Sequence, residues 1–302
     1  EMCIRDRSEI VVMVIAVIDT GINLQFKEFN NLDITPVNID NSNVDTEDRN
    51  GHGTATIGEI VRVNKNIQIL SIKILDDMGK TSLSSLVNAL EYCSKRDDIN
   101  IINLSLSCTI YDHEVIEYLH ILIKKIVKSG KKIVSSLNND RGEKISFPAL
   151  FNEVISVKHE YSEKTYISYD YELSCFVLHS PFHMMPHKSG EYCFYKGNSC
   201  AAPQISGILT TLNANGLKQL KTYREKEYIY NYHNDELKQF IEMFCLEKYG
   251  IQNQMKVQSE DCFCLLKHIE KQFSIELDYI AFTTEDFLNL NLLVGKCSLY
   301  LN

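Results

Sequence analysis

Apolar runs alternate with amphipathic stretches over the first part of this chain, and this alternation constrains the fold more than any other feature. The runs are rich in Val, Ile and Leu, which is typical of strands buried on both faces. They are residues 10–18, 67–75, 99–106, 133–134 and 154–157. Between them, residues 81–94 and 114–128 place apolar side chains at helical spacing. The alternation predicts an α/β fold with a doubly wound, mostly parallel sheet and helices on both faces.

Proline and glycine are distributed unevenly along the 302 residues. All five prolines lie before residue 204, and eleven of the thirteen glycines lie before residue 217. The remainder carries apolar stripes at helical spacing over residues 237–245 and 263–273, with a third apolar region at 287–294. This change predicts a larger domain at 8–220 and a small helical domain at 230–302.

Residues 1–7 form a separate feature at the N-terminus. They match neither a signal peptide nor a helix pattern, and they are similar to the translation of a sequencing adapter. We interpret them as an artefact, which leaves the true N-terminus, and therefore secretion, open.

Composition excludes several classes of protein. The formal net charge of −9 disfavours a broad nucleic-acid surface. The longest apolar run has nine residues, too few to cross a membrane. No two of the ten cysteines have the C-x-x-C spacing of zinc or thioredoxin-type sites, so reduced thiols and a cytoplasmic location are expected.

Three short motifs carry residue types that do chemistry. Asp19 follows a buried strand and precedes a glycine, which places its carboxylate at the carboxyl edge of the predicted sheet. His52 lies between two glycines, ahead of a helix-like stretch. Ser199 begins another helix-like stretch, near the positive end of its dipole. Each residue alone has an ordinary explanation as a turn or cap residue, but together they supply an acid, a base and a nucleophile.

At these residues the chain resembles the subtilisin-like serine peptidases. DTGI at 19–22, GHGT at 51–54 and GNSCAAP at 197–203 are similar to the three signatures of that family, in the same Asp, His, Ser order. The resemblance covers residues 10–215. It implies that Ser199 attacks the scissile carbonyl, that His52 transfers the proton, and that Asp19 orients His52.

The resemblance also implies further site residues. Asn139 is the expected side-chain donor of the oxyanion hole, with Asn138 as the alternative, because the family's usual Gly-Asn is Asn-Asn here. Ser105, Leu106 and Ser107 are the expected substrate-binding segment, which pairs with an extended peptide. Ser107 stands where the family usually has glycine, so we expect a narrower specificity pocket.

No metal site is expected in this chain. An acidic stretch precedes His52, and we interpret it as a solvated loop rather than a calcium site. Its members are Asp40, Asp45, Glu47 and Asp48.

The C-terminal segment weakly resembles an acyl carrier protein. In that family a Ser at the start of the second helix carries phosphopantetheine, and Ser259 is at the corresponding position. The family's Asp-Ser-Leu is Gln-Ser-Glu here. The alternative is an amphipathic bundle that serves packing or docking.

These observations predict a cytoplasmic serine endopeptidase that acts on a peptide or protein and needs no cofactor for catalysis. The weak resemblance of the C-terminal segment to an acyl carrier protein implies one prosthetic group, phosphopantetheine on Ser259. Maturation of a peptide product is one expected role. The alternative is an inactive peptide-binding or carrier-linked module, and the oligomeric state stays open.

Overall fold

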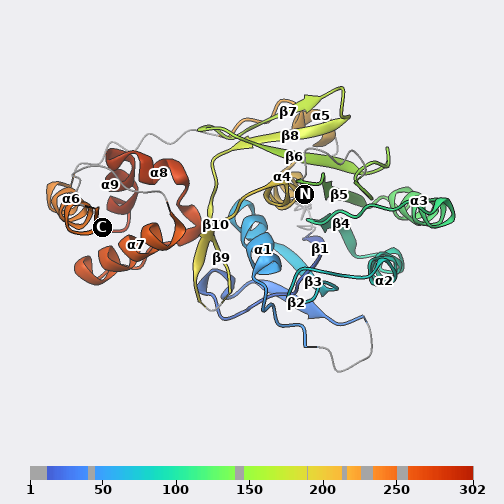
Figure 1. Cartoon of the computed structure of the whole chain (residues 1–302), viewed down its shortest axis with the longest axis horizontal. Coiled ribbons are helices and arrows are strands. Elements are labelled where there is room, and N and C mark those ends of the chain that lie inside the picture. The colour runs from blue at the N-terminus through green and yellow to red at the C-terminus, as the bar shows by residue number, and fades with distance from the viewer. Residues whose placement is uncertain are drawn as a thin grey trace, which may run out of the picture.

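A computed structural model describes residues 12–39, 45–139, 146–188, 190–212, 216–225, 234–249 and 258–301. Its main sheet has eight strands in the order β2-β3-β1-β4-β5-β6-β8-β7 (Figure 1). The strands are β1 Met13–Asp19, β2 Asp33–Val37, β3 Ile67–Lys73, β4 Ile99–Leu104, β5 Lys132–Ser136, β6 Ile155–Tyr161, β7 Tyr166–Asp170 and β8 Cys175–Ser180. Every neighbouring pair is parallel except β7 and β8, which are antiparallel.

The two faces of this sheet bury two separate sets of apolar side chains. Along β1, Ile15 and Val17 belong to one cluster, and the alternating Val14, Ala16 and Ile18 belong to the other. Helices α1 His52–Val63 and α4 Ala201–Thr211 cover the first face, and α2 Leu83–Ser94 and α3 His113–Lys128 cover the second (Figure 1). The predicted α/β fold with helices on both faces is therefore confirmed.

Local sequence explains where helices α2 and α3 begin. Ser82 accepts a hydrogen bond from Ser85 N–H, and Asp112 accepts from Glu114 N–H, so each satisfies an amide that the helix itself leaves unpaired. The sequence prediction overlooked β2, which carries Pro36. Proline is tolerated there because β2 is an edge strand.

A two-stranded sheet connects the main sheet to the C-terminal helices. Its strands are β9 Met184–Pro186 and β10 Tyr192–Phe194. The remaining helices are α5 Gly216–Leu220, α6 Asp235–Tyr249, α7 Ser259–Phe273, α8 Thr284–Leu288 and α9 Leu290–Ser298, with 3-10 turns η1 Lys27–Phe29, η2 Asn198–Cys200 and η3 Tyr279–Ala281. Helices α6 to α9 lie beside β9 and β10, away from the main sheet (Figure 1).

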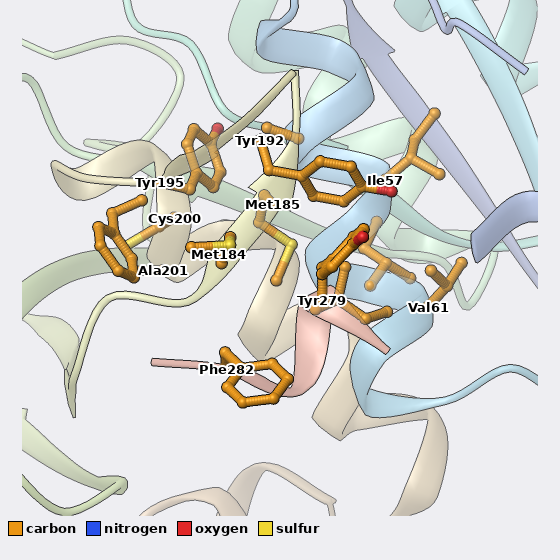
Figure 2. Packing of buried hydrophobic residues seen from close by; sticks show 14 of the residues in the cluster. Ile57, Val61, Met184, Met185, Tyr192, Tyr195, Cys200, Ala201, Tyr279 and Phe282 are labelled. Atoms are coloured by element: carbon orange, nitrogen blue, oxygen red, sulfur yellow. The ribbon is translucent and has the colours of Figure 1, made fainter. Parts of the chain in front are cut away.

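The C-terminal helices pack directly against β9. Met184 N–H donates to Phe282 O, and Thr284 N–H donates to Phe182 O, both at 2.9 Å. Tyr279 and Phe282 are fully buried and lie in the same apolar cluster as Met184 (Figure 2). The tail thus shares one apolar core with the face of the sheet that α1 and α4 cover.

Some residues that the sequence analysis singled out lie outside the described residues. They are residues 1–7, Asp40 of the acidic stretch, and residues 226–230 of the predicted domain boundary. The division into domains at 8–220 and 230–302 stays a prediction. Among the described residues, no helix is both long enough and apolar enough to cross a membrane.

Candidate active site

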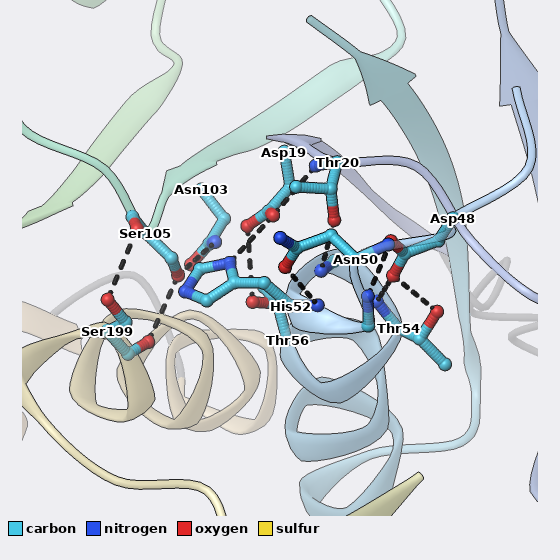
Figure 3. A network of polar contacts seen from close by, with 12 residues as sticks. Asp19, Thr20, Asp48, Asn50, His52, Thr54, Thr56, Asn103, Ser105 and Ser199 are labelled. Carbon is cyan, nitrogen blue, oxygen red and sulfur yellow. Dashed lines mark hydrogen bonds and ion pairs between the residues drawn. The ribbon is translucent and has the colours of Figure 1, made fainter. Parts of the chain in front are cut away.

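Asp19 is the last residue of β1, and its carboxylate is almost completely buried. Its Oδ1 accepts from Thr20 N–H at 2.8 Å and lies 2.7 Å from His52 Nδ1. Its Oδ2 accepts from the hydroxyl of Thr56 at 3.2 Å. Three hydrogen bonds therefore fix the orientation of this buried carboxylate, which faces the imidazole (Figure 3).

His52 is the first residue of α1, and the close approach of this helix to the end of β1 sets its position. Gly53 N–H donates to Thr20 Oγ1 at 2.8 Å. A Cβ at Gly53 would overlap the backbone oxygen of Gly21. Glycine at position 53 therefore allows the contact that brings His52 to Asp19.

The loop before α1 is held by the carboxylate of Asp48. Its Oδ1 accepts from Asn50 N–H and Gly51 N–H, and its Oδ2 accepts from the backbone and hydroxyl of Thr54. Asp48 is thus buried and bound to the protein, whereas Asp45 and Glu47 of the same acidic stretch are exposed. The expectation that this stretch is solvated is therefore wrong at Asp48. Within the described residues, no group of three or more His, Cys, Asp or Glu side chains is arranged to hold a metal ion.

The environment of His52 changes its basicity. Burial lowers the pKa of the imidazole, but the negative charge of Asp19 and the hydrogen bond to it outweigh burial, and Asp48 adds to the effect. The net result is a pKa raised above 6.5. A buried carboxylate beside the imidazole is what a general base needs in order to accept and hold a proton.

Ser199 lies in η2, at the start of the helix that continues as α4. Its hydroxyl donates to Ser105 O at 3.3 Å, and the hydroxyl of Ser105 donates back to Ser199 O at 3.1 Å. Ser199, His52 and Ser105 line one cavity (Figure 3). The structure therefore brings all three motif residues to the same edge of the sheet, with Asp19 behind His52.

The hydrogen-bond partner of His52 Nε2 is Tyr195 rather than Ser199. The Tyr195 hydroxyl lies 3.1 Å from Nε2. The sequence reading missed Tyr195, because no local pattern marks a tyrosine four residues before the serine as a neighbour of the histidine.

The Asn139 side chain lies beside the segment that leads to Ser199. Its Oδ1 accepts from Asn198 N–H at 2.7 Å, which orients the amide and leaves Nδ2 to donate elsewhere. Gly197 has a φ of +86°, and a Cβ there would come within 3.0 Å of Asn139 Oδ1. Asn138 contributes its backbone, since its carbonyl oxygen accepts from Asn198 Nδ2 at 2.9 Å. The assignment of Asn139 rather than Asn138 to an oxyanion hole stays a prediction.

The cavity has a volume of about 760 Å³. Ser105, Leu106 and Ser107, directly after β4, form one side, and Asn138 and Asn139 form another. Apolar side chains of α2 and α3 and of the loop before α3 extend it away from His52, among them Leu83, Leu86, Ile110 and Val115. The cavity is large enough for several residues of an extended peptide.

Ser259 is the first residue of α7 and lies far along the chain from the cavity residues. Its Oγ accepts a hydrogen bond from Phe194 N–H at 2.9 Å, and the residue is half-buried. Attachment of phosphopantetheine to this hydroxyl stays a prediction. No catalytic step is assigned to that group.

The chain is similar in sequence to a known family and to known serine proteases. The sequence model described as "Subtilase family" matches residues 12–243. The major intracellular serine protease of Bacillus subtilis (strain 168) is 27% identical over 238 residues, 71% of this chain and 70% of that protein. The intracellular serine protease of Paenibacillus polymyxa is 26% identical over 218 residues, 66% of this chain and 65% of that protein.

A solved structure supports the fold assignment. The crystal structure of a cold adapted subtilisin-like serine proteinase aligns with a TM-score of 0.55 and 20% sequence identity. The alignment covers 71% of this chain and 78% of the other. This similarity shows that the two chains share a fold.

Proposed function

Because the chain belongs to the subtilase family and is thereby a serine-type endopeptidase, we propose that Asp19, His52 and Ser199 carry out its chemistry. This membership confirms the resemblance predicted from the three motifs. The observation that carries the proposal is the 2.7 Å contact between Asp19 Oδ1 and His52 Nδ1, beside a cavity that also exposes Ser199.

The proposed reaction begins when Ser199 Oγ attacks the carbonyl carbon of a peptide bond. His52 Nε2 takes the hydroxyl proton, and the charge of Asp19 stabilises the imidazolium that forms. The oxygen of the tetrahedral intermediate accepts hydrogen bonds from Ser199 N–H and Asn139 Nδ2. The C–N bond then breaks, His52 protonates the leaving amine, and water hydrolyses the acyl-enzyme by the same route.

The substrate is a peptide or a protein, as for the family. In the proposed binding mode the peptide lies along Ser105, Leu106 and Ser107 and pairs with their backbone. Ser107 narrows the pocket for the residue before the scissile bond. The intracellular serine proteases among the relatives support a cytoplasmic location. Maturation of a peptide product and modification of Ser259 belong to the same proposal, and the latter would add the mass of phosphopantetheine to the protein.

A fluorophosphonate probe tests the assignment of the nucleophile. We expect the wild type to form a covalent adduct, and peptide mapping should place that adduct on Ser199. Ser199→Ala should remove labelling, whereas Ser129→Ala, at the exposed end of α3, should not. A folded wild type that resists the probe would favour the alternative of an inactive peptide-binding module.

A further inference from the structure

Tyr195 is a buried tyrosine directly behind the candidate active site. It follows β10 and lies at the edge of the apolar cluster, close to Cys200 and Ala201 (Figure 2). Its backbone N–H donates to His183 O at 3.0 Å. Its ring meets the imidazole of His52 edge to face, with centroids 5.5 Å apart. The side chain is thus held in place from its backbone to its hydroxyl.

The Tyr195 hydroxyl has three polar neighbours. They are Thr56 Oγ1 at 2.9 Å, His52 Nε2 at 3.1 Å and Ser199 O at 3.3 Å. Burial, and next the charge of Asp19, raise the pKa of Tyr195 well above 10, so the phenol stays protonated at neutral pH. It therefore has one proton to donate, and Thr56 Oγ1, His52 Nε2 and Ser199 O are all within hydrogen-bond range to accept it.

The two ring nitrogens of His52 have different hydrogen-bond partners. Nδ1 faces the Asp19 carboxylate, so we assign the proton of the neutral ring to Nδ1. Nε2 then has one lone pair, and among the described residues the Tyr195 hydroxyl lies in hydrogen-bond range of it. Ser199 donates instead to Ser105 O. Tyr195 and Ser199 therefore compete for the single acceptor site of the base.

We propose that Tyr195 is a positioning residue that holds His52 in a resting arrangement and yields Nε2 to Ser199 when the reaction begins. This inference rests on the proposed function, because it assumes that Ser199 must reach Nε2. The hydrogen bond between Ser199 and Ser105 is 3.3 Å long. It is therefore weak, and the serine can turn toward His52 once Tyr195 releases Nε2.

The C-terminal helices hold the segment that carries Tyr195. Phe194, the residue before it, donates its N–H to Ser259 Oγ of α7. Since β10 is also paired with β9, the backbone at Tyr195 is anchored on both sides. Release of Nε2 is therefore a movement of the Tyr195 or His52 side chain rather than of the strand.

The variant Tyr195→Phe removes the hydroxyl and keeps the ring. We expect the second-order rate of inactivation by a fluorophosphonate, and kcat on a peptide substrate, to rise about two- to tenfold, the range for one hydrogen bond. KM should stay within about twofold, because Tyr195 does not line the cavity. A change in packing alone would not raise kcat at constant KM.

Tyr192→Phe is the matched control. Tyr192 is buried in β10 and donates its hydroxyl to Glu28 Oε2 at 2.6 Å, away from His52. This variant loses the same group on the same segment, so its kcat should equal that of the wild type at temperatures where it is folded. An equal increase in both variants would overturn the proposal.

The outcomes separate the inference from the proposed function. If the wild type and Tyr195→Phe are labelled on Ser199 at equal rates, or the variant more slowly, the inference fails and the proposed function stands. If neither protein is labelled, both fail. If Tyr195→Phe does not fold, a crystal structure of the phosphonylated wild type decides. There Tyr195 should lie beyond hydrogen-bond distance of Nε2, and a retained contact would overturn the proposal.

Discussion

The side chains of Asp19 and His52 are exposed to very different extents. The carboxylate is 1% exposed, whereas the imidazole is 30% exposed. A buried carboxylate is costly unless it is hydrogen-bonded, and Thr20, Thr56 and His52 supply those bonds. The ring therefore meets a fixed charge on one side and the cavity on the other.

The raised pKa of His52 gives a pH prediction. The base works when neutral, so activity should rise with pH through a midpoint above 6.5. Asp19→Asn removes the negative charge that favours the imidazolium, so the midpoint should move to lower pH. The maximal rate should also fall, by about 10⁴, because the ring loses its preferred tautomer.

The pH dependence of fluorophosphonate inactivation measures this shift on the free enzyme. Asp97→Asn, an exposed residue in the turn between α2 and β4, is the control for the loss of one charge, and its midpoint should match that of the wild type. An unchanged midpoint in Asp19→Asn would contradict the electrostatic explanation.

At the scale of elements, the site depends on how closely α1 approaches the end of β1. Gly53→Ala would drive its methyl group into the backbone oxygen of Gly21. Because that oxygen belongs to the main chain, the helix must move. A displacement of about 1 Å between His52 and Asp19 is enough to lower activity by about 100-fold.

The matched control is Gly216→Ala, at the start of α5. A Cβ there has its nearest neighbour at 3.4 Å, which is an ordinary contact. Peptide hydrolysis at a temperature where both variants are folded should show the loss for Gly53→Ala alone. Full activity of Gly53→Ala would show that α1 can shift without disturbing the pair.

The sequence could predict those features that depend on residues close together in the chain. Asp19 at a strand end and His52 at a helix start follow from patterns within a few residues of each. Tyr195 could not be found that way, because its partner Thr56 is 139 positions away and the contact exists only once α1 packs beside the segment that follows β10. The strands β9 and β10 were also not predicted, because each has only three residues and part of their burial comes from the C-terminal helices.

At the scale of the whole molecule, one apolar core extends from the sheet into the tail. Ile15 of β1, Met184 of β9 and Phe282 after η3 belong to the same cluster. The fall in glycine and proline content near residue 217 therefore does not mark the edge of this apolar core. The C-terminal helices contribute to the surroundings of Tyr195 through α7 and β10.

Asp19, His52 and Ser199 are proposed to act as one catalytic unit, and the turnover of single and double variants on one peptide substrate tests this. His52→Ala and Ser199→Ala should each lower kcat by about 10⁶, the loss found for subtilisin. The double variant should be no slower than either single one, because the remaining residue has no partner to act on. A His52→Ala enzyme within tenfold of wild type, or additive losses in the double variant, would show that these residues do not act as one unit.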